Sequence, residues 1–341
     1  ESYIMVVLVF VVQLGYVDSS FTCLFGIFKV TMKFAVAKIG ESPLRDRLAE
    51  GIVQAFLDHG HVLSNEDDPE VQFVLNLAEA DNPRPYRRRS RAVFVATFVA
   101  AERLPDSAPR AVYTLLVRSL SNLALYAVPT DEGAEVHFST LESGFYRVPY
   151  DPEVLYQRIF PLASARLIIE NDLVPDLPER YHNGTPITEE LIRFGKEMDR
   201  LGVLPAPFPI HELLSERDLR HVYRLYGITG LSYGNLGARE DIPELGPTTF
   251  WVTARGVNKA KLSKVGKDIM LVKGFDRERS RIIVSVPPDH DPKARASVDA
   301  IEHYLIYSNF PGVRAIVHLH AWMEGVLCTH QNYPCGTREL A

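Results

Sequence analysis

Hydrophobic and polar residues follow strand and helix periods in turn once the chain has passed residue 31. Residues 34–39 alternate as a half-buried strand does, and 42–59 carry apolar side chains at helical spacing. Ser42 and Pro43 suit the start of that helix, because serine caps the first turn and proline needs no amide partner there. The sequence therefore predicts a strand followed directly by a helix.

The same alternation continues along the next part of the chain. Apolar, β-branched runs predict strands over 71–77, 92–100 and 136–140, and amphipathic patterns predict helices over 109–125 and 152–167. Strands that alternate with helices are typical of an α/β fold. We therefore expect an α/β domain over residues 32–202, and no motif in it indicates its role.

A proline-dense segment follows this first domain. Pro205, Pro207 and Pro209 lie within a few residues of one another, which predicts a linker over 203–212. We expect a second domain over 213–341.

The first 31 residues differ from the rest of the chain. Two apolar runs, 4–12 and 21–30, are shorter than the roughly 18 to 20 residues that a membrane-spanning helix needs. The segment also lacks the basic start of a signal peptide. Met32 precedes the globular pattern directly, so we expect 1–31 to be a leader or an upstream translated segment.

Charge and cysteine content indicate which partners and which cellular compartment to expect for this protein. The 341 residues include 37 Lys and Arg against 43 Asp and Glu, a formal net charge of -6. The electric field of a net negative charge repels nucleic acid and anionic membranes, so we expect neither as a partner. Three cysteines are too few for a disulfide framework or a cysteine-only metal site, which favours the cytoplasm.

Two histidines stand at the end of a predicted strand over 313–319. In His318-Leu319-His320 the two-residue period of a strand places both imidazoles on one side. A backbone can present two ligands to one zinc ion in this way, although a polar strand end gives the same pattern. The pair is therefore a candidate metal site.

A predicted helix over 297–307 carries polar residues on one face. Asp299, His303 and Tyr307 recur every four residues, so their side chains project from the same side of the helix. The carboxylate is a candidate for proton transfer. His303 and Tyr307 fit a packing and capping role equally well.

Four motifs follow one another in this part of the chain: Gly234-Asn235, Thr253-x-x-Gly256, Ser297-x-Asp299-x-x-x-His303-x-x-x-Tyr307 and His318-x-His320. In order and spacing they resemble the motifs of the class II aldolase/adducin family, which includes fuculose-phosphate aldolases and ribulose-phosphate 4-epimerases. The resemblance covers about 213–341. It implies an α/β/α domain with a central, mainly antiparallel sheet, present here as an incomplete, C-terminally truncated copy fused to an α/β domain of unrecognised family.

The resemblance also implies roles for particular residues. It assigns His318 and His320 as ligands of Zn²⁺ or another divalent metal, and Asp299 as the catalytic proton-transfer group. It further implies that the substrate is held by Asn235, Gly256 and Ser297.

Two points stay open: the third metal ligand, and whether the chain resembles the aldolases or the epimerases of the family. The third metal ligand would be His330, a residue past Ala341 or a residue of a partner chain, or the site has none. Asp299 suits the epimerase branch, whereas Asn332 stands where epimerases carry a catalytic aspartate.

The resemblance implies a metal-dependent aldehyde-lyase or an epimerase-like enzyme. It would act on a small sugar or sugar phosphate through retro-aldol and enediolate chemistry, as a cytoplasmic homo-oligomer in carbohydrate metabolism. The alternative is a non-catalytic, adducin-like module for interaction and oligomerisation. The retained carboxylate and histidine pair favour the enzyme.

Overall fold

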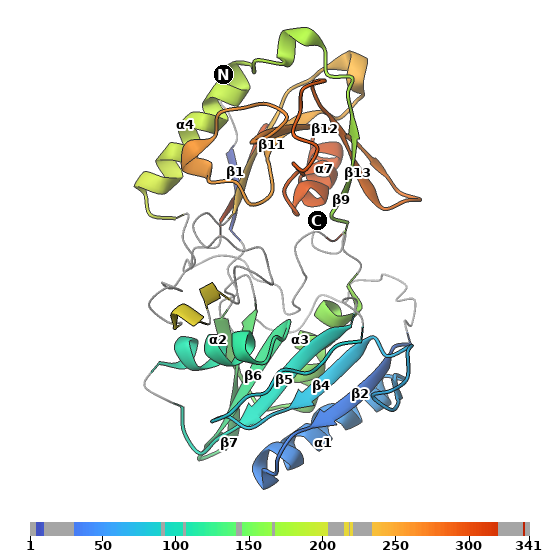
Figure 1. Cartoon of the computed structure of the whole chain (residues 1–341), viewed down its shortest axis with the longest axis vertical. Helices are drawn as coiled ribbons and strands as arrows, with labels where there is room; N and C mark the ends of the chain where they lie inside the picture. Colours follow the sequence, from blue (N-terminus) through green and yellow to red (C-terminus); the bar gives the residue numbers. More distant parts are fainter. Residues whose placement is uncertain are drawn as a thin grey trace.

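The computed structural model describes residues 31–89, 93–104, 107–140, 145–165, 168–203, 215–217, 219–220, 234–319 and 337, and the backbone of 5–9. Within these ranges the strands form two sheets, each packed against helices (Figure 1). No helix in the described ranges combines the length and apolar character needed to cross a membrane.

The first sheet is parallel on one side and antiparallel on the other. Its strands follow the order β3 (Val62–Leu63), β2 (Lys33–Lys38), β4 (Phe73–Leu77), β5 (Phe94–Ala100), β6 (Leu123–Thr130), β7 (Gly133–Thr140) and β8 (Phe145–Pro149). The pairs from β3 to β6 are parallel, and β7 and β8 extend the sheet as an antiparallel meander. The α/β expectation for this part of the chain is confirmed.

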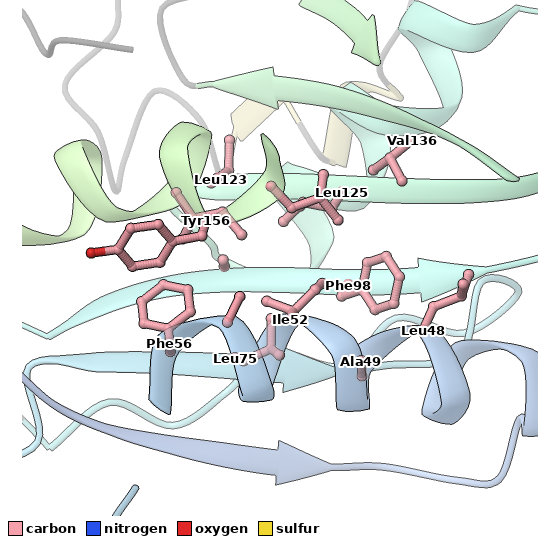
Figure 2. Close-up of a cluster of buried hydrophobic side chains, with 14 of the residues drawn as sticks. Leu48, Ala49, Ile52, Phe56, Leu75, Phe98, Leu123, Leu125, Val136 and Tyr156 are labelled. Carbon is pink, nitrogen blue, oxygen red and sulfur yellow. The ribbon is translucent and has the colours of Figure 1, made fainter. Parts of the chain in front are cut away.

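Helices cover both faces of the first sheet. Helices α1 (Pro43–Asp58) and α3 (Pro152–Ser164) pack on one face, where Ile52, Phe56 and Leu125 belong to a single apolar cluster (Figure 2). Helix α2 (Ala108–Arg118) packs on the other face against the alternate strand residues, such as Tyr126. Period-two alternation along each strand thus supplies two cores.

Local sequence explains where these helices begin and end. Ser42 caps α1, its Oγ accepting a hydrogen bond from the Arg45 amide at 3.4 Å, as Ser42-Pro43 predicts. The end predicted for the helix over 109–125 is wrong. Helix α2 stops at Arg118 because Leu120, at φ 54°, turns the chain directly into β6.

The second sheet is mainly antiparallel. Its strands follow the order β1 (Met5–Val9), β14 (Ala315–Leu319), β10 (Asn235–Arg239), β11 (Phe250–Thr253), β12 (Ile269–Asp276), β13 (Arg281–Ser285) and β9 (Glu170–Val174). Pairs from β14 to β13 are antiparallel, and β1 and β9 add parallel edges. The strand predicted over 313–319 is present as β14.

Among the described residues, one α-helix lies on each face of this sheet. Helix α7 (Ala300–Asn309) packs through Ile301 and Tyr307 on one face, and α4 (Pro186–Arg200) packs through Leu191 and Met198 on the other. Short 3-10 helices complete the unit: η1 (Glu179–Tyr181), η2 (Pro243–Leu245) and η3 (Lys259–Lys261). The described part therefore has the expected α/β/α layers.

Two features of the second sheet bear on the predicted domain limits. Strand β9 and helix α4, both inside the expected first domain at 32–202, pack with the second sheet. Most of the predicted linker at 203–212 lies outside the described residues. Strand β1 comes from 1–31 and pairs with β14, while the assignment of 1–31 as a leader stays a prediction.

The aromatic cluster of the first sheet gives a test of this packing. Phe56 is fully buried and stacks on Phe73 with ring centroids 5.1 Å apart, whereas the adjacent Leu57 is 38% exposed. We expect Phe56→Ala to lower the free energy of unfolding by about 3–5 kcal/mol because it leaves a cavity. Leu57→Ala should change it by less than about 1 kcal/mol. Urea unfolding measures both, and equal losses would contradict the packing described here.

Candidate functional site

Two paired strands bring the first site residues together. His318 lies near the end of β14, and Asn235 opens β10 directly opposite it in the antiparallel register. Gly234 precedes Asn235 at φ 77°, where a Cβ would also collide with the His318 carbonyl oxygen. Glycine is therefore needed for this close approach of the two strands. Both His318 and Asn235 are buried.

Asp299 completes the cluster from the start of α7. Its Oδ2 accepts hydrogen bonds from Asn235 Nδ2 and, at 3.1 Å, from Ser297 Oγ. The same oxygen lies 3.1 Å from His318 Nδ1. Asp299 is only 3% exposed, so these contacts offset the cost of removing its charge from water.

The contacts of His318 favour one tautomer. Nδ1 lies 3.0 Å from Asn235 Nδ2 as well as 3.1 Å from the Asp299 carboxylate, and it can donate a proton only to the carboxylate. A hydrogen bond to an ionised acceptor is roughly twice as strong as one between neutral groups. We therefore assign the proton to Nδ1, which leaves Nε2 as the ring nitrogen with a lone pair for a metal.

Backbone contacts fix the turn that carries Asp299. The Ser297 amide donates to the Thr253 carbonyl at 3.2 Å, and the Arg255 amide donates to the Arg295 carbonyl at 2.8 Å. Ala254 and Ala296 form an antiparallel bridge between these two contacts. The Thr253-x-x-Gly256 loop and the Ser297-x-Asp299 turn, separate motifs in the sequence, are thus joined in one structure.

The predicted site residues fall into three groups. Asp299, His318, Asn235 and Ser297 converge in the cluster just described. Gly256 is exposed in the turn that follows β11. His320, like His330, lies outside the described residues.

The substrate-binding role expected of Asn235 and Ser297 stays a prediction. The structure shows that their side-chain donors contact the Asp299 carboxylate, so both residues also orient and stabilise that carboxylate.

His303 lies behind the cluster on α7. Its ring is 1% exposed, and a Cβ on Gly237 of β10 would collide with its Nδ1. Burial lowers the pKa of His303 to about 4, an effect that the charge of Asp299 partly opposes and that of His318 reinforces. His303 is therefore neutral at pH 7. Tyr307, also buried, packs on Phe250 with ring centroids 4.8 Å apart.

Lys259 is a residue that the sequence pattern did not single out. It begins η3, three residues after Gly256, and is only 4% exposed. Burial lowers the pKa of its ammonium to about 8, and the charge of Asp299 opposes that shift. In the sequence Lys259 and Lys261 look alike, so nothing in the local pattern separates the buried lysine from its exposed neighbour.

Comparison with known proteins gives one match. Residues 218–339 match the family model of the class II aldolase and adducin N-terminal domain. The matched segment contains Asn235, Lys259, Asp299 and His318. Neither the curated proteins nor the solved structures give a match.

The described residues fit part of a metal site. The His318 imidazole, backed by the Asp299 carboxylate at Nδ1, has the arrangement in which a carboxylate orients a metal-binding histidine. Within the described ranges no group of three or more His, Cys, Asp or Glu could hold a metal ion. A complete ligand set would therefore need residues outside those ranges, among which His320 stands two positions from His318.

The buried His303 predicts a dependence of stability on pH. Its folded pKa, about 4, lies below its ordinary value of 6.5, so the unfolded chain binds the extra proton between these values. The neutral state of buried His303 contributes fully to the free energy of unfolding above pH 6.5. This contribution is lost as the pH falls toward 4, and the total loss is about 3 kcal/mol.

The measurement is the free energy of unfolding against pH for the wild type, His303→Gln and the control His290→Gln. We expect His303→Gln to show a flatter acid limb and His290→Gln to follow the wild type. An acid limb that is identical in all three would rule out a buried neutral His303.

Proposed function

We propose that the second sheet carries the site of a metal-dependent aldehyde-lyase or epimerase-like enzyme. The observation that supports this most is the buried contact between Asp299 and His318, 3.1 Å from Oδ2 to Nδ1, at the meeting point of β14, β10 and α7. A scaffold without chemistry gains little from burying a carboxylate against an imidazole, because both must be desolvated. The family match over 218–339 agrees with this function and also includes adducins.

Each residue of the cluster has a part in the proposed reaction. His318 would hold the metal through Nε2, together with His320. A divalent ion such as Zn²⁺, when bound, acts as a Lewis acid that stabilises negative charge developing on a carbonyl oxygen. Asn235 and Ser297 hold Asp299 through Oδ2, and we assign Oδ1 of the same carboxylate to the transfer of the substrate proton.

The proposed substrate is a small sugar or sugar phosphate. Breaking the bond between the α and β carbons of a β-hydroxy carbonyl compound leaves the electron pair of that bond in an enediolate, and forming the bond consumes the enediolate. This is the charge that the site would stabilise. As in the family that the sequence resembles, the protein would act in the cytoplasm as a homo-oligomer.

Metal content tests this proposal directly. We expect purified wild-type protein to bind close to one equivalent of zinc, and His318→Ala to lose at least 90% of it because an essential ligand is removed. His290→Ala is the matched control. This histidine is part-buried in the same half of the chain, and among the described residues its ring bonds only to the Pro287 carbonyl, at 2.9 Å. Atomic absorption on dialysed samples gives the ratio. Equal zinc in all three proteins, or none in the wild type, would contradict the metal site and favour the adducin-like alternative.

Asp299→Asn separates catalysis from metal binding. The amide keeps the shape of the carboxylate but cannot take up a proton, so we expect turnover of a ketose phosphate panel to fall at least 100-fold. Zinc content should fall far less than in His318→Ala, because Asp299 supports His318 and is not itself a proposed ligand. Unchanged turnover in Asp299→Asn would remove the carboxylate from the mechanism.

A further inference from the structure

The turn that carries Asp299 is also held by a strand from outside the family match. Strand β9 lies upstream of the matched residues 218–339, yet it pairs in parallel with β13 at the edge of the second sheet (Figure 1). Asn171 of β9 is 8% exposed, and its Oδ1 accepts a hydrogen bond from the Ala296 amide at 2.6 Å. A side chain 125 residues away in the sequence is therefore bonded to the residue directly before Ser297.

The backbone geometry explains why Ala296 needs this acceptor. Ala296 forms an antiparallel bridge with Ala254, and the hydrogen bonds of the bridge are made by its neighbours, through the Arg295 carbonyl and the Ser297 amide. In such a pair the central residue points its own amide away from the partner strand. Ala296 is fully buried, so its amide would lack an acceptor there without Asn171.

Strand β9 is fixed in the sheet independently of this bond. Asn171 lies opposite Ile282 of β13 in the parallel register. The next residue, Asp172, accepts hydrogen bonds from Arg281 at 2.5 Å and from Arg279 at 2.7 Å. Successive side chains of a strand project to opposite faces, so Asp172 anchors β9 on the side away from Asn171. The sheet therefore sets the position of Asn171.

The residues that lead into β9 contact the same turn. Arg255 Nη2 donates to the Ile169 carbonyl at 2.6 Å. Ile168 is 3% exposed and belongs to the same apolar cluster as Ala296 and Ala300. Backbone, side-chain and apolar contacts thus join the start of β9 to the two segments that meet at the bridge.

The contacts continue from Ala296 to the carboxylate. Ser297, the next residue, donates through Oγ to Asp299 Oδ2 at 3.1 Å, and the same oxygen lies 3.1 Å from His318 Nδ1. Asn171 is therefore two hydrogen bonds and one peptide unit from the oxygen that faces His318.

We propose that Asn171 is a positioning residue for the proposed reaction, holding the turn so that the Asp299 carboxylate meets His318. This inference rests on the proposed function, because it concerns the carboxylate of the same site. A reacting group misplaced by about 1 Å can cost about 100-fold in rate. The site would thus depend on a strand that the family match does not include.

The test compares three variants of the full chain. Asn171→Leu keeps the approximate size of the side chain and removes the acceptor. Asn171→Asp keeps an oxygen in the same place and is the conservative variant. Asp172→Asn is the matched control, since it breaks the ion pairs of the adjacent residue on β9 and leaves the bond to Ala296 in place.

Two NMR signals report on the turn without a substrate. We expect the Ala296 amide of Asn171→Leu to exchange its hydrogen at least about tenfold faster than in the wild type, because it has lost its acceptor. The ¹⁵N resonance of His318 Nδ1 should also move, since the carboxylate that it contacts is displaced. Asn171→Asp and Asp172→Asn should keep both signals close to those of the wild type.

Turnover of the ketose phosphate panel, measured at equal zinc content, gives the functional readout. We expect kcat of Asn171→Leu to fall about tenfold while KM stays within about twofold, because proton transfer is affected more than substrate binding. Asn171→Asp should recover kcat to within about threefold, and Asp172→Asn should turn over as the wild type does. If Asn171→Leu fails to fold, Asn171→Ser takes its place, because its shorter side chain does not reach the Ala296 amide.

The outcomes separate this inference from the proposed function. A His318 resonance that is unchanged in Asn171→Leu, or displaced equally in Asp172→Asn, overturns the positioning role even when zinc is bound. Absence of zinc from wild-type protein instead overturns the proposed function, whatever the two NMR signals show.

Discussion

The contact between the Asp299 carboxylate and the His318 imidazole is the constraint on which the second half of the molecule depends. Both groups are almost completely buried, so each needs the other and the surrounding donors to offset the loss of water. Asn235 supplies one donor from β10, and Ser297 supplies another from the turn before α7. These contacts hold β14, β10 and the start of α7 together around the Asp299 carboxylate.

Much of the fold follows from local sequence. The run over 313–319 predicts β14, and Ser42 with Pro43 predicts the start of α1, because these signals act over a few residues. The packing of β9 with β13 could not be predicted in this way. Strand pairing between distant segments depends on the whole sheet, whereas a local pattern shows only that a strand forms.

The sequence predicts which residues belong to the candidate site better than it predicts the role of each residue. The spacing of the motifs predicts that Asp299 and His318 belong to one site. The structure places Asp299 Oδ2 3.1 Å from His318 Nδ1. The same spacing did not reveal that Asn235 and Ser297 donate to the carboxylate, because hydrogen-bond direction depends on side-chain conformation. Lys259 was missed for a related reason: burial of a lysine depends on the helix packed over it, here α4 through Gly195.

The tautomer of His318 tests the central claim most directly. ¹⁵N NMR of protein labelled in its histidine rings distinguishes a proton on Nδ1 from one on Nε2. The account predicts a proton on Nδ1 of His318, and a shift of the Nε2 resonance when zinc is added. A proton on Nε2, with a spectrum that zinc leaves unchanged, would contradict it.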